Sequence, residues 1–286
     1  MVPGWPGLGH IYSIEESFIN LEKDFALVYW NLRGAGTSRG TPPSDSITIA
    51  QMEEDLDLLI ETLLMKYDHS SIFLAAHSFG ANLTGNYLTE RLLRREVAGF
   101  ISIDGNLDRI HMHERMRTEV LDYAAQRTDN PYWKEAYDYC LEPPVPPADY
   151  NPVYDYADTA DIISMQNDLQ KMYLDIMLKS FTQKYGNTEL IATQLGGYDS
   201  VFSGPFSQRV EQLDTIDLPV LLLHGKYENT GLGRENAEHL LSQFSTPVEN
   251  KGYVMFEESG HFPYRTEPEK FSQSIRDFIN KIQGRI

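Results

Sequence analysis

The stretch Phe73-Leu-Ala-Ala-His-Ser-Phe-Gly80 decides the fold of this 286-residue chain. Its apolar first half predicts a buried strand, and a helical pattern begins directly after Ser78. The turn between strand and helix must be tight, so the residues two before and two after the serine have to be small. Ala76 and Gly80 satisfy this requirement. The stretch therefore predicts a strand–turn–helix unit with a serine at its sharpest point.

Strand-like and helix-like segments alternate along the chain around this unit. Such alternation predicts βαβ units and a mostly parallel sheet flanked by helices, an α/β fold. The predicted strands are Ala26–Trp30, Ser71–Ala75, Val97–Ile103, Pro219–Leu223 and Tyr253–Phe256. The predicted helices are Ile49–Met65 with Ser46 as its cap, Gly80–Arg95, and Pro268–Ile282, whose apolar residues Phe271, Ile275, Phe278, Ile279 and Ile282 share one face.

Residues of about 107–207 interrupt this alternation. They contain the Tyr- and Met-rich helical segments Tyr132–Tyr139 and Ala160–Tyr185, separated by the turn Pro143–Pro147. We expect residues 1–106 and 208–286 to form the core and residues 107–207 to form an inserted helical cap. Met1–Pro3 leaves little room for a strand before a Gly-rich turn that begins at Gly4.

The composition limits the classes of partner. A net charge of −18 and a pI near 4.8 argue against a nucleic-acid-binding protein, which would carry clustered Lys and Arg. The sequence contains no apolar run of about 18 residues and no signal peptide, so neither a membrane nor secretion is expected. Cys140 is the single cysteine, which fits a reducing compartment and predicts a cytoplasmic protein.

The serine and a later histidine form the central chemical pattern. Ala76-His77-Ser78-Phe79-Gly80 is a variant of the G-x-S-x-G turn that exposes a nucleophilic serine. His261, in Glu258-Ser-Gly-His-Phe-Pro263, lies between the last strand and the final helix, where a general base belongs in this arrangement. We therefore predict Ser78 as the nucleophile and His261 as its base.

Two carboxylates compete for the role of the acid that orients this base. Glu228 lies in the loop after the penultimate strand, in Leu221-Leu-Leu-His-Gly-Lys-Tyr-Glu228. Asp104 ends the preceding strand, in Ile101-Ser-Ile-Asp-Gly-Asn106, and reaches the imidazole from the other side. Glu228 is favoured, and Asp104 stays as the alternative.

A Gly/Pro-rich turn near the start is the candidate oxyanion loop. Pro3-Gly4-Trp5-Pro6-Gly7 places flexible backbone before the first helical segment. We expect the backbone N–H groups of Trp5 and Phe79 to bind the negative oxygen of a tetrahedral intermediate.

These motifs resemble the proline iminopeptidase group (prolyl aminopeptidases) of α/β hydrolases. The family's His-Gly-Gly-Pro-Gly loop is similar to Pro3-Gly4-Trp5-Pro6-Gly7, and its Asp-Gln-Arg-Gly-x-Gly-x-Ser segment to Asn31–Ser38. Thr48–Leu56 resembles the helix that follows, and the Gly-Arg-Tyr-Asp acid loop is similar to Gly225–Glu228. The resemblance spans both halves of the core and is faint in the cap. It implies an α/β-hydrolase fold and removal of an N-terminal residue, often proline, from a short peptide.

The chain departs from the family at three of these positions. Pro3 and Trp5 replace His and Gly in the first loop, and Glu228 replaces Asp in the acid loop. The family holds the free amine of its substrate with cap carboxylates. The corresponding candidates here are Glu114, Glu119, Glu135, Asp138 and Glu142.

Other activities are found on the same fold. A carboxylesterase or another small-molecule hydrolase would use the same triad, and a non-catalytic protein of the same fold is a third alternative. Epoxide hydrolases and dehalogenases share the fold but use a carboxylate where Ser78 stands. His111-Met-His113 has strand-type spacing without further ligands, so no metal or other cofactor is expected. His77 is expected to pack or hydrogen-bond locally.

Overall fold

The sheet carries four parallel strands in chain order. A computed structural model describes residues 1–4, 9–35, 37–38, 48–68, 70–90, 96–105, 107–142, 151–162, 210–227 and 233–284. The strands are β1 (Ile72–His77), β2 (Val97–Ile103), β3 (Val220–Gly225) and β4 (Lys251–Phe256). They pair in the order β1-β2-β3-β4, all parallel, so each connection crosses over one face of the sheet.

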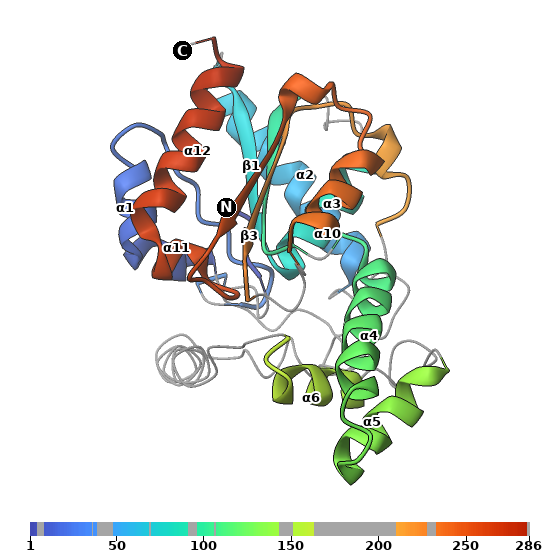
Figure 1. The fold of residues 1–286 in the computed structure, drawn as a ribbon. Helices are drawn as coiled ribbons and strands as arrows, with labels where there is room; N and C mark the ends of the chain where they lie inside the picture. The colour runs from blue at the N-terminus through green and yellow to red at the C-terminus, as the bar shows by residue number, and fades with distance from the viewer. Residues whose placement is uncertain are drawn as a thin grey trace.

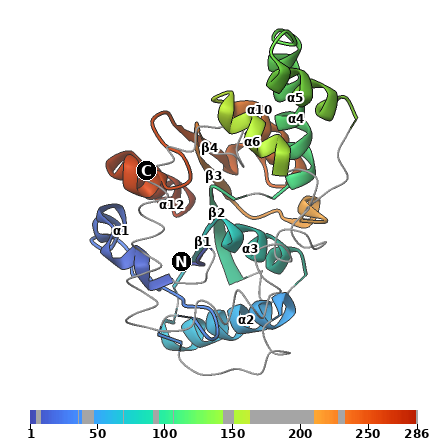
Figure 2. The ribbon, with the colours of Figure 1, turned by 90° about the horizontal axis from the view of Figure 1, so that it is seen from below.

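Helices cover both faces of this sheet. Figure 2 shows α1 and α12 on one side, with α3 and α10 on the other. The helical segments are η1 (Gly9–Ile14), α1 (Glu16–Leu21), α2 (Ile49–Lys66), α3 (Phe79–Glu90), α4 (Arg109–Ala125), α5 (Pro131–Leu141), α6 (Asn151–Thr159), η6 (Leu213–Thr215), α10 (Gly233–Gln243), η7 (Val248–Asn250), α11 (Pro263–Thr266) and α12 (Pro268–Ile282). Within the described ranges, none of these helices is both long and apolar enough to cross a membrane.

Most predicted elements are confirmed, with ends that shift by a few residues. Val97–Ile103 and Pro268–Ile282 match β2 and α12 at both ends. The cap of α2 was predicted wrongly, because Thr48 rather than Ser46 precedes its first residue. The Thr48 side chain accepts a hydrogen bond from the Gln51 backbone N–H at 3.2 Å.

The predicted strand Ala26–Trp30 is wrong, because the structure contains no strand there, although the segment bonds to Met1. The Met1 amine donates to the Val28 carbonyl at 2.6 Å, and the Trp30 N–H donates to the Met1 carbonyl at 3.3 Å. On its other side, Val2 bonds to β1 through the Ala75 carbonyl and the His77 N–H, at 2.8 and 3.1 Å. Met1–Pro3 therefore occupies the place of a strand but provides only one bridge residue.

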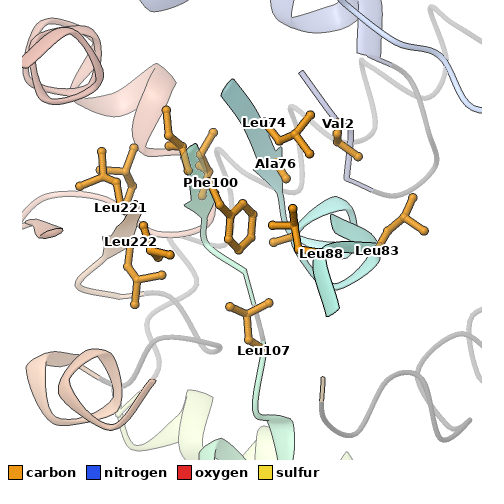
Figure 3. Close-up of a cluster of buried hydrophobic side chains, with 14 of the residues drawn as sticks. Val2, Leu74, Ala76, Leu83, Leu88, Phe100, Leu107, Leu221 and Leu222 are labelled. Atoms are coloured by element: carbon orange, nitrogen blue, oxygen red, sulfur yellow. The ribbon is translucent and has the colours of Figure 1, made fainter. Parts of the chain in front are cut away.

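The central strands are buried on both faces, as expected for a parallel sheet covered by helices. Figure 3 shows Leu74 and Ala76 of β1, Phe100 of β2 and Leu221 of β3 packed together, with Val2 beside Ala76. All six residues of β3 are buried. The core therefore fixes the carboxyl ends of β1, β2 and β3, where the candidate site lies.

The predicted apolar face of α12 is confirmed. Phe271, Ile275, Phe278 and Ile279 are buried, and Ile282 packs against the same cluster. Each such side chain contributes about 1.5–3 kcal/mol of burial free energy. The helix therefore anchors the segment that follows the His261 loop.

The helices α4, α5 and α6 have an apolar cluster of their own. They project beyond one end of the sheet in Figure 1. Their cluster contains Met116, Val120, Ala124, Trp133, Ala136, Cys140, Val153, Tyr156 and Ala157. The predicted helix Tyr132–Tyr139 is α5, whereas Pro143–Pro147 and most of Ala160–Tyr185 lie outside the described residues. The division into core and cap at residues 107 and 207 stays a prediction.

Asp108 joins this helical group to the core. It is the N-cap of α4, and its Oδ1 accepts a hydrogen bond from the His111 N–H at 3.1 Å. Its Oδ2 lies 3.1 Å from Nε2 of His239 on α10. The rings of His111 and His239 stack, with centroids 3.7 Å apart.

We predict that Asp108→Ala lowers the free energy of unfolding by about 0.5–2 kcal/mol, the usual cost of losing a side-chain N-cap. Urea denaturation followed by circular dichroism measures the change. Asp108→Asn keeps an oxygen that can cap the helix and should lose much less. Equal losses in the two variants would contradict a capping role.

Candidate active site

Ser78 occupies a left-handed turn between β1 and α3. Its φ is 53°, a conformation that is uncommon for a non-glycine residue and that clusters at functional sites. Its N–H donates to the Ile103 carbonyl at 2.9 Å, and its carbonyl accepts from the Ala81 N–H at 2.9 Å. The predicted strand–turn–helix unit is confirmed, and Ser78 stands at its apex, partly exposed.

Position 80 requires glycine because the first residues of the chain pass directly over it. A Cβ on Gly80 would lie 2.5 Å from the Pro3 carbonyl oxygen and 2.6 Å from that of Val2. Both neighbours are backbone atoms, so they cannot yield as a side chain could. Gly4 also lies against the turn, because its Cβ would lie 3.1 Å from Ser78 Cβ. The predicted need for a small residue at position 80 is thus explained by the candidate oxyanion loop.

Of the two predicted oxyanion donors, only Phe79 lies within the described residues. Phe79 is the buried first residue of α3, at the end of the helix where backbone N–H groups point outwards and favour negative charge. Trp5 lies outside the described residues. The N–H of Gly4 donates to the Tyr12 hydroxyl at 3.2 Å. The oxyanion role of Trp5 and Phe79 stays a prediction.

The loop that carries His261 reaches the residue next to Ser78. The His261 carbonyl oxygen lies 2.8 Å from Nε2 of His77, and the two imidazole rings are 4.6 Å apart between centroids. His261 lies between β4 and α11, as its sequence position predicted. The structure therefore brings the nucleophile turn and the predicted base loop together, and the role of His261 as base stays a prediction.

Several contacts hold the base loop in place. Gly225, at the end of β3, packs so closely on the loop that a Cβ would overlap the Gly260 carbonyl. From the other side, one carboxylate oxygen of Glu267 accepts from the Ser259 hydroxyl at 2.6 Å and from the Glu258 N–H at 3.1 Å. These contacts hold the loop between the carboxyl end of β3 and the start of α12.

The two candidate acids remain alternatives. Asp104 is completely buried at the end of β2, with φ 43°, and its Oδ1 accepts from the Gly225 N–H at 2.8 Å. This bond places its carboxylate beside the strand end that packs on Gly260. Glu228 lies outside the described residues, which stop at Tyr227 before its loop.

The sequence did not reveal the partner of His77. Its Nδ1 lies 3.0 Å from the hydroxyl of Tyr12, 65 residues earlier in the chain. Burial lowers the pKa of His77 well below 6.5, the nearby His261 lowers it further, and the bond to the His261 carbonyl acts in the opposite direction. The expectation that His77 packs and hydrogen-bonds locally is confirmed. No spacing or motif links Tyr12 to it.

Three of the five cap carboxylates form ion pairs within their own helices. The pairs are Glu114–Arg117 at 2.9 Å, Glu119–Arg115 at 3.1 Å and Asp138–Lys134 at 2.5 Å. Glu135 and Glu142 are exposed. The charge of the first three is therefore partly countered before any substrate arrives.

His111 and His113 diverge because they lie on helix α4 and not on a strand. His111 stacks on His239, as described above, whereas Nε2 of His113 lies 3.0 Å from the Tyr154 hydroxyl. Burial, with a smaller effect of the nearby Arg109, lowers the pKa of His113 to about 3. The two rings therefore have different partners, on α10 and on α6, and do not converge.

The parallel sheet and the serine turn define a class of protein, and comparison with known families agrees. The model for the alpha/beta hydrolase fold matches residues 1–268, and the chain belongs to this family.

Individual relatives are distant. The chain is 22% identical over 289 residues to the "Probable aminopeptidase YbaC" of Bacillus subtilis strain 168, covering 96% of this chain and 85% of that protein. An epoxide hydrolase from Bacillus megaterium superposes with a TM-score of 0.58 at 18% identity, covering 98% of this chain and 92% of that one. An esterase from Exiguobacterium antarcticum gives 0.54 at 17% identity, with the same coverage. At these identities the structures share the fold.

We predict that Gly80→Ala lowers the free energy of unfolding by about 1–3 kcal/mol, because the new methyl overlaps backbone oxygens of Val2 and Pro3. Denaturation midpoints measure this loss. Gly252→Ala is the matched control, since its Cβ would meet the end of the Leu221 side chain at 2.9 Å and backbone only at 3.9 Å, from the Val220 carbonyl oxygen. Equal stability of the two variants would contradict the close packing at Gly80.

We also predict a pH effect from His77. As the pH falls below 6.5, the unfolded chain binds a proton that the buried imidazole of the folded protein does not. The free energy of unfolding therefore decreases towards acid pH, by at most about 1.4 kcal/mol per pH unit for this group. His77→Gln removes the group, so its stability should fall less steeply from pH 6.5 to about pH 5. Parallel curves for wild type and variant would refute the prediction.

Proposed function

We propose that this protein is a serine hydrolase that acts by acyl transfer, with Ser78 as nucleophile and His261 as general base. The observation that carries the proposal is the left-handed turn at Ser78, φ 53°, between a buried parallel strand and a helix. This geometry projects a serine hydroxyl from the carboxyl edge of the sheet. The loop of His261 packs against the residue before that serine.

In the proposed reaction, Ser78 Oγ attacks the substrate carbonyl carbon while His261 accepts the hydroxyl proton. The carbonyl oxygen becomes an oxyanion. His261 then gives the proton to the leaving group as the carbon–leaving-group bond breaks, which yields an acyl-enzyme. Water then attacks the acyl carbon while His261 accepts its proton. The bond between this carbon and Ser78 Oγ breaks, the carboxylic acid product leaves, and His261 returns the proton to Ser78. Glu228, or in its place Asp104, holds the imidazole in the required tautomer.

The oxyanion would be bound by backbone N–H groups of Trp5 and Phe79. Because Phe79 opens α3, the partial positive charge of the helix N-terminus adds to the hydrogen bond. One such donor is typically worth about 10²–10³ in rate.

An aminopeptidase is the favoured activity within this class. It is supported by the resemblance of four core motifs to prolyl aminopeptidases and by the printed name of the Bacillus subtilis relative. Such an enzyme needs an anionic group to bind the free amine of a short peptide. Glu135 and Glu142 are exposed and lie in the helical group that would cover the site.

A carboxylesterase is the second candidate. The ion pairs of Glu114, Glu119 and Asp138 favour it, because they reduce the negative charge available for a substrate amine. An ester substrate needs no such charge. Both candidates use the same nucleophile and base.

We predict that a fluorophosphonate probe labels wild-type protein on Ser78 and fails to label Ser78→Ala. Turnover of an activated ester should fall by about 10⁵–10⁶ in Ser78→Ala, because nucleophile and base act as a unit. Ser242→Ala, an exposed serine on α10, is the control and should behave as wild type. Retention of more than about a tenth of the turnover in Ser78→Ala would overturn the assignment.

We predict that prolyl or alanyl anilides are cleaved in preference to p-nitrophenyl acetate, judged by kcat/KM. An aminopeptidase should also fail to cleave the anilide when the substrate's amine is acetylated, because the substrate then lacks its positive charge. Preference for the ester, with no effect of the amine, would favour the carboxylesterase. Absence of both activities and of labelling would leave a non-catalytic member of the family.

A further inference from the structure

The residues Tyr12 and His77 form one buried hydrogen-bond chain between two loops of the candidate site. The Gly4 N–H donates to the Tyr12 hydroxyl at 3.2 Å, that hydroxyl lies 3.0 Å from His77 Nδ1, and His77 Nε2 lies 2.8 Å from the His261 carbonyl oxygen. Tyr12 is 1% exposed and His77 is 4% exposed. The chain runs from the candidate oxyanion loop, past the nucleophile turn, to the base loop.

The chemistry of these groups allows one direction for every bond. A carbonyl oxygen can only accept, so the proton of a neutral His77 sits on Nε2. The ring's Nδ1 then has a lone pair, and the Tyr12 hydroxyl donates to it. The Tyr12 oxygen is left to accept from the Gly4 N–H. Burial keeps His77 neutral, which this assignment requires.

Aromatic rings enclose this chain on several sides. The ring of Tyr12 lies edge-on to Phe18 and Tyr264, with centroids 5.3 and 5.4 Å apart, and Phe262 lies 5.6 Å from His77. In such surroundings an interrupted chain leaves a buried polar group without its partner, which costs free energy. Each bond therefore constrains the position of the backbone at its end.

We propose that His77 and Tyr12 are positioning residues that set the place of the His261 loop and of the Gly4 backbone relative to Ser78. His77 is suited to this because it ends strand β1, whereas the two ends of the hydrogen-bond chain, the Gly4 N–H and the His261 carbonyl, belong to loops. Gly4 packs directly on the turn, since its Cβ would lie 2.9 Å from His77 Nδ1. The inference rests on the proposed function of Ser78 and His261.

Two substitutions of His77 each remove a different one of its two hydrogen bonds. The amide nitrogen of glutamine reaches about as far as Nε2, so His77→Gln can still donate to the His261 carbonyl but loses the acceptor for Tyr12. The oxygen of asparagine takes the place of Nδ1, so His77→Asn can still accept from Tyr12 but loses the bond to His261. Tyr12→Phe removes the hydroxyl and leaves the ring packing unchanged.

We expect the largest loss of kcat in His77→Asn, because this variant loses the bond to the His261 loop. A displacement of about 1 Å at a reacting group can cost about 10²-fold in rate. We expect kcat per active site to fall about 10²-fold in His77→Asn and about tenfold in His77→Gln and Tyr12→Phe, with KM within a factor of about three. The acid limb of the kcat/KM pH profile, which reports the base, should shift in His77→Asn and stay in His77→Gln.

The test counts active sites with the fluorophosphonate and measures ester turnover per labelled site. A purely structural role would reduce the number of labelled sites and leave kcat per site and the pH profile unchanged, which would overturn the inference. Equal losses in His77→Asn and His77→Gln would also overturn it. Tyr29→Phe is a matched control, since the Tyr29 hydroxyl bonds to Glu22 at 2.6 Å, away from this chain.

A readout that does not depend on activity separates this inference from the proposed function. Nitrogen-15 imidazole spectra of the wild type should show His77, identified by its loss in His77→Gln, as the neutral Nε2–H tautomer from pH 8 to about pH 5. The Nδ1–H tautomer, or titration near pH 6.5, would overturn the chain of bonds. If the spectrum is as expected but the probe does not label Ser78, the proposed nucleophile is wrong and the bond directions are confirmed.

Discussion

The close approach of the first residues to the Ser78 turn is the constraint on which the candidate site depends. Val2 bonds to β1 on both sides of Ala76, and Pro3 then passes over Gly80 at a distance that admits no Cβ. This contact brings the Gly/Pro loop to the serine without a long strand. The left-handed turn at Ser78 therefore lies between Pro3 and Gly4 on one side and helix α3 on the other.

The sheet connects this turn to the other segments of the candidate site. The Ser78 N–H bonds to the end of β2, the Asp104 carboxylate bonds to the end of β3, and Gly225 packs on the loop before His261. Each step joins neighbouring parallel strands at their carboxyl ends, where ligands bind in open α/β sheets. Because β2 and β3 are almost completely buried, these strand ends cannot move independently.

The helices α4, α5 and α6, which belong to the predicted cap, contact the core at Asp108. Asp108 caps α4 and bonds to His239 of α10, while the apolar cluster of α4, α5 and α6 is separate from that of the core. The core therefore carries the chemistry of the proposed reaction, and the helices above it would decide the substrate. This division agrees with motifs that resemble one family in the core and are faint in the cap.

The amino-acid sequence by itself determined the α/β class, four of the five predicted strands, the Ser78 turn and the apolar face of α12, because each depends on a local pattern of apolar and small residues. It failed at Ala26–Trp30, which is not a strand and which bonds to Met1 through Val28 and Trp30. It also could not join Tyr12 to His77, or Gly225 to Gly260. Those contacts arise between residues distant in the chain, and only the packing of the sheet and its loops decides them.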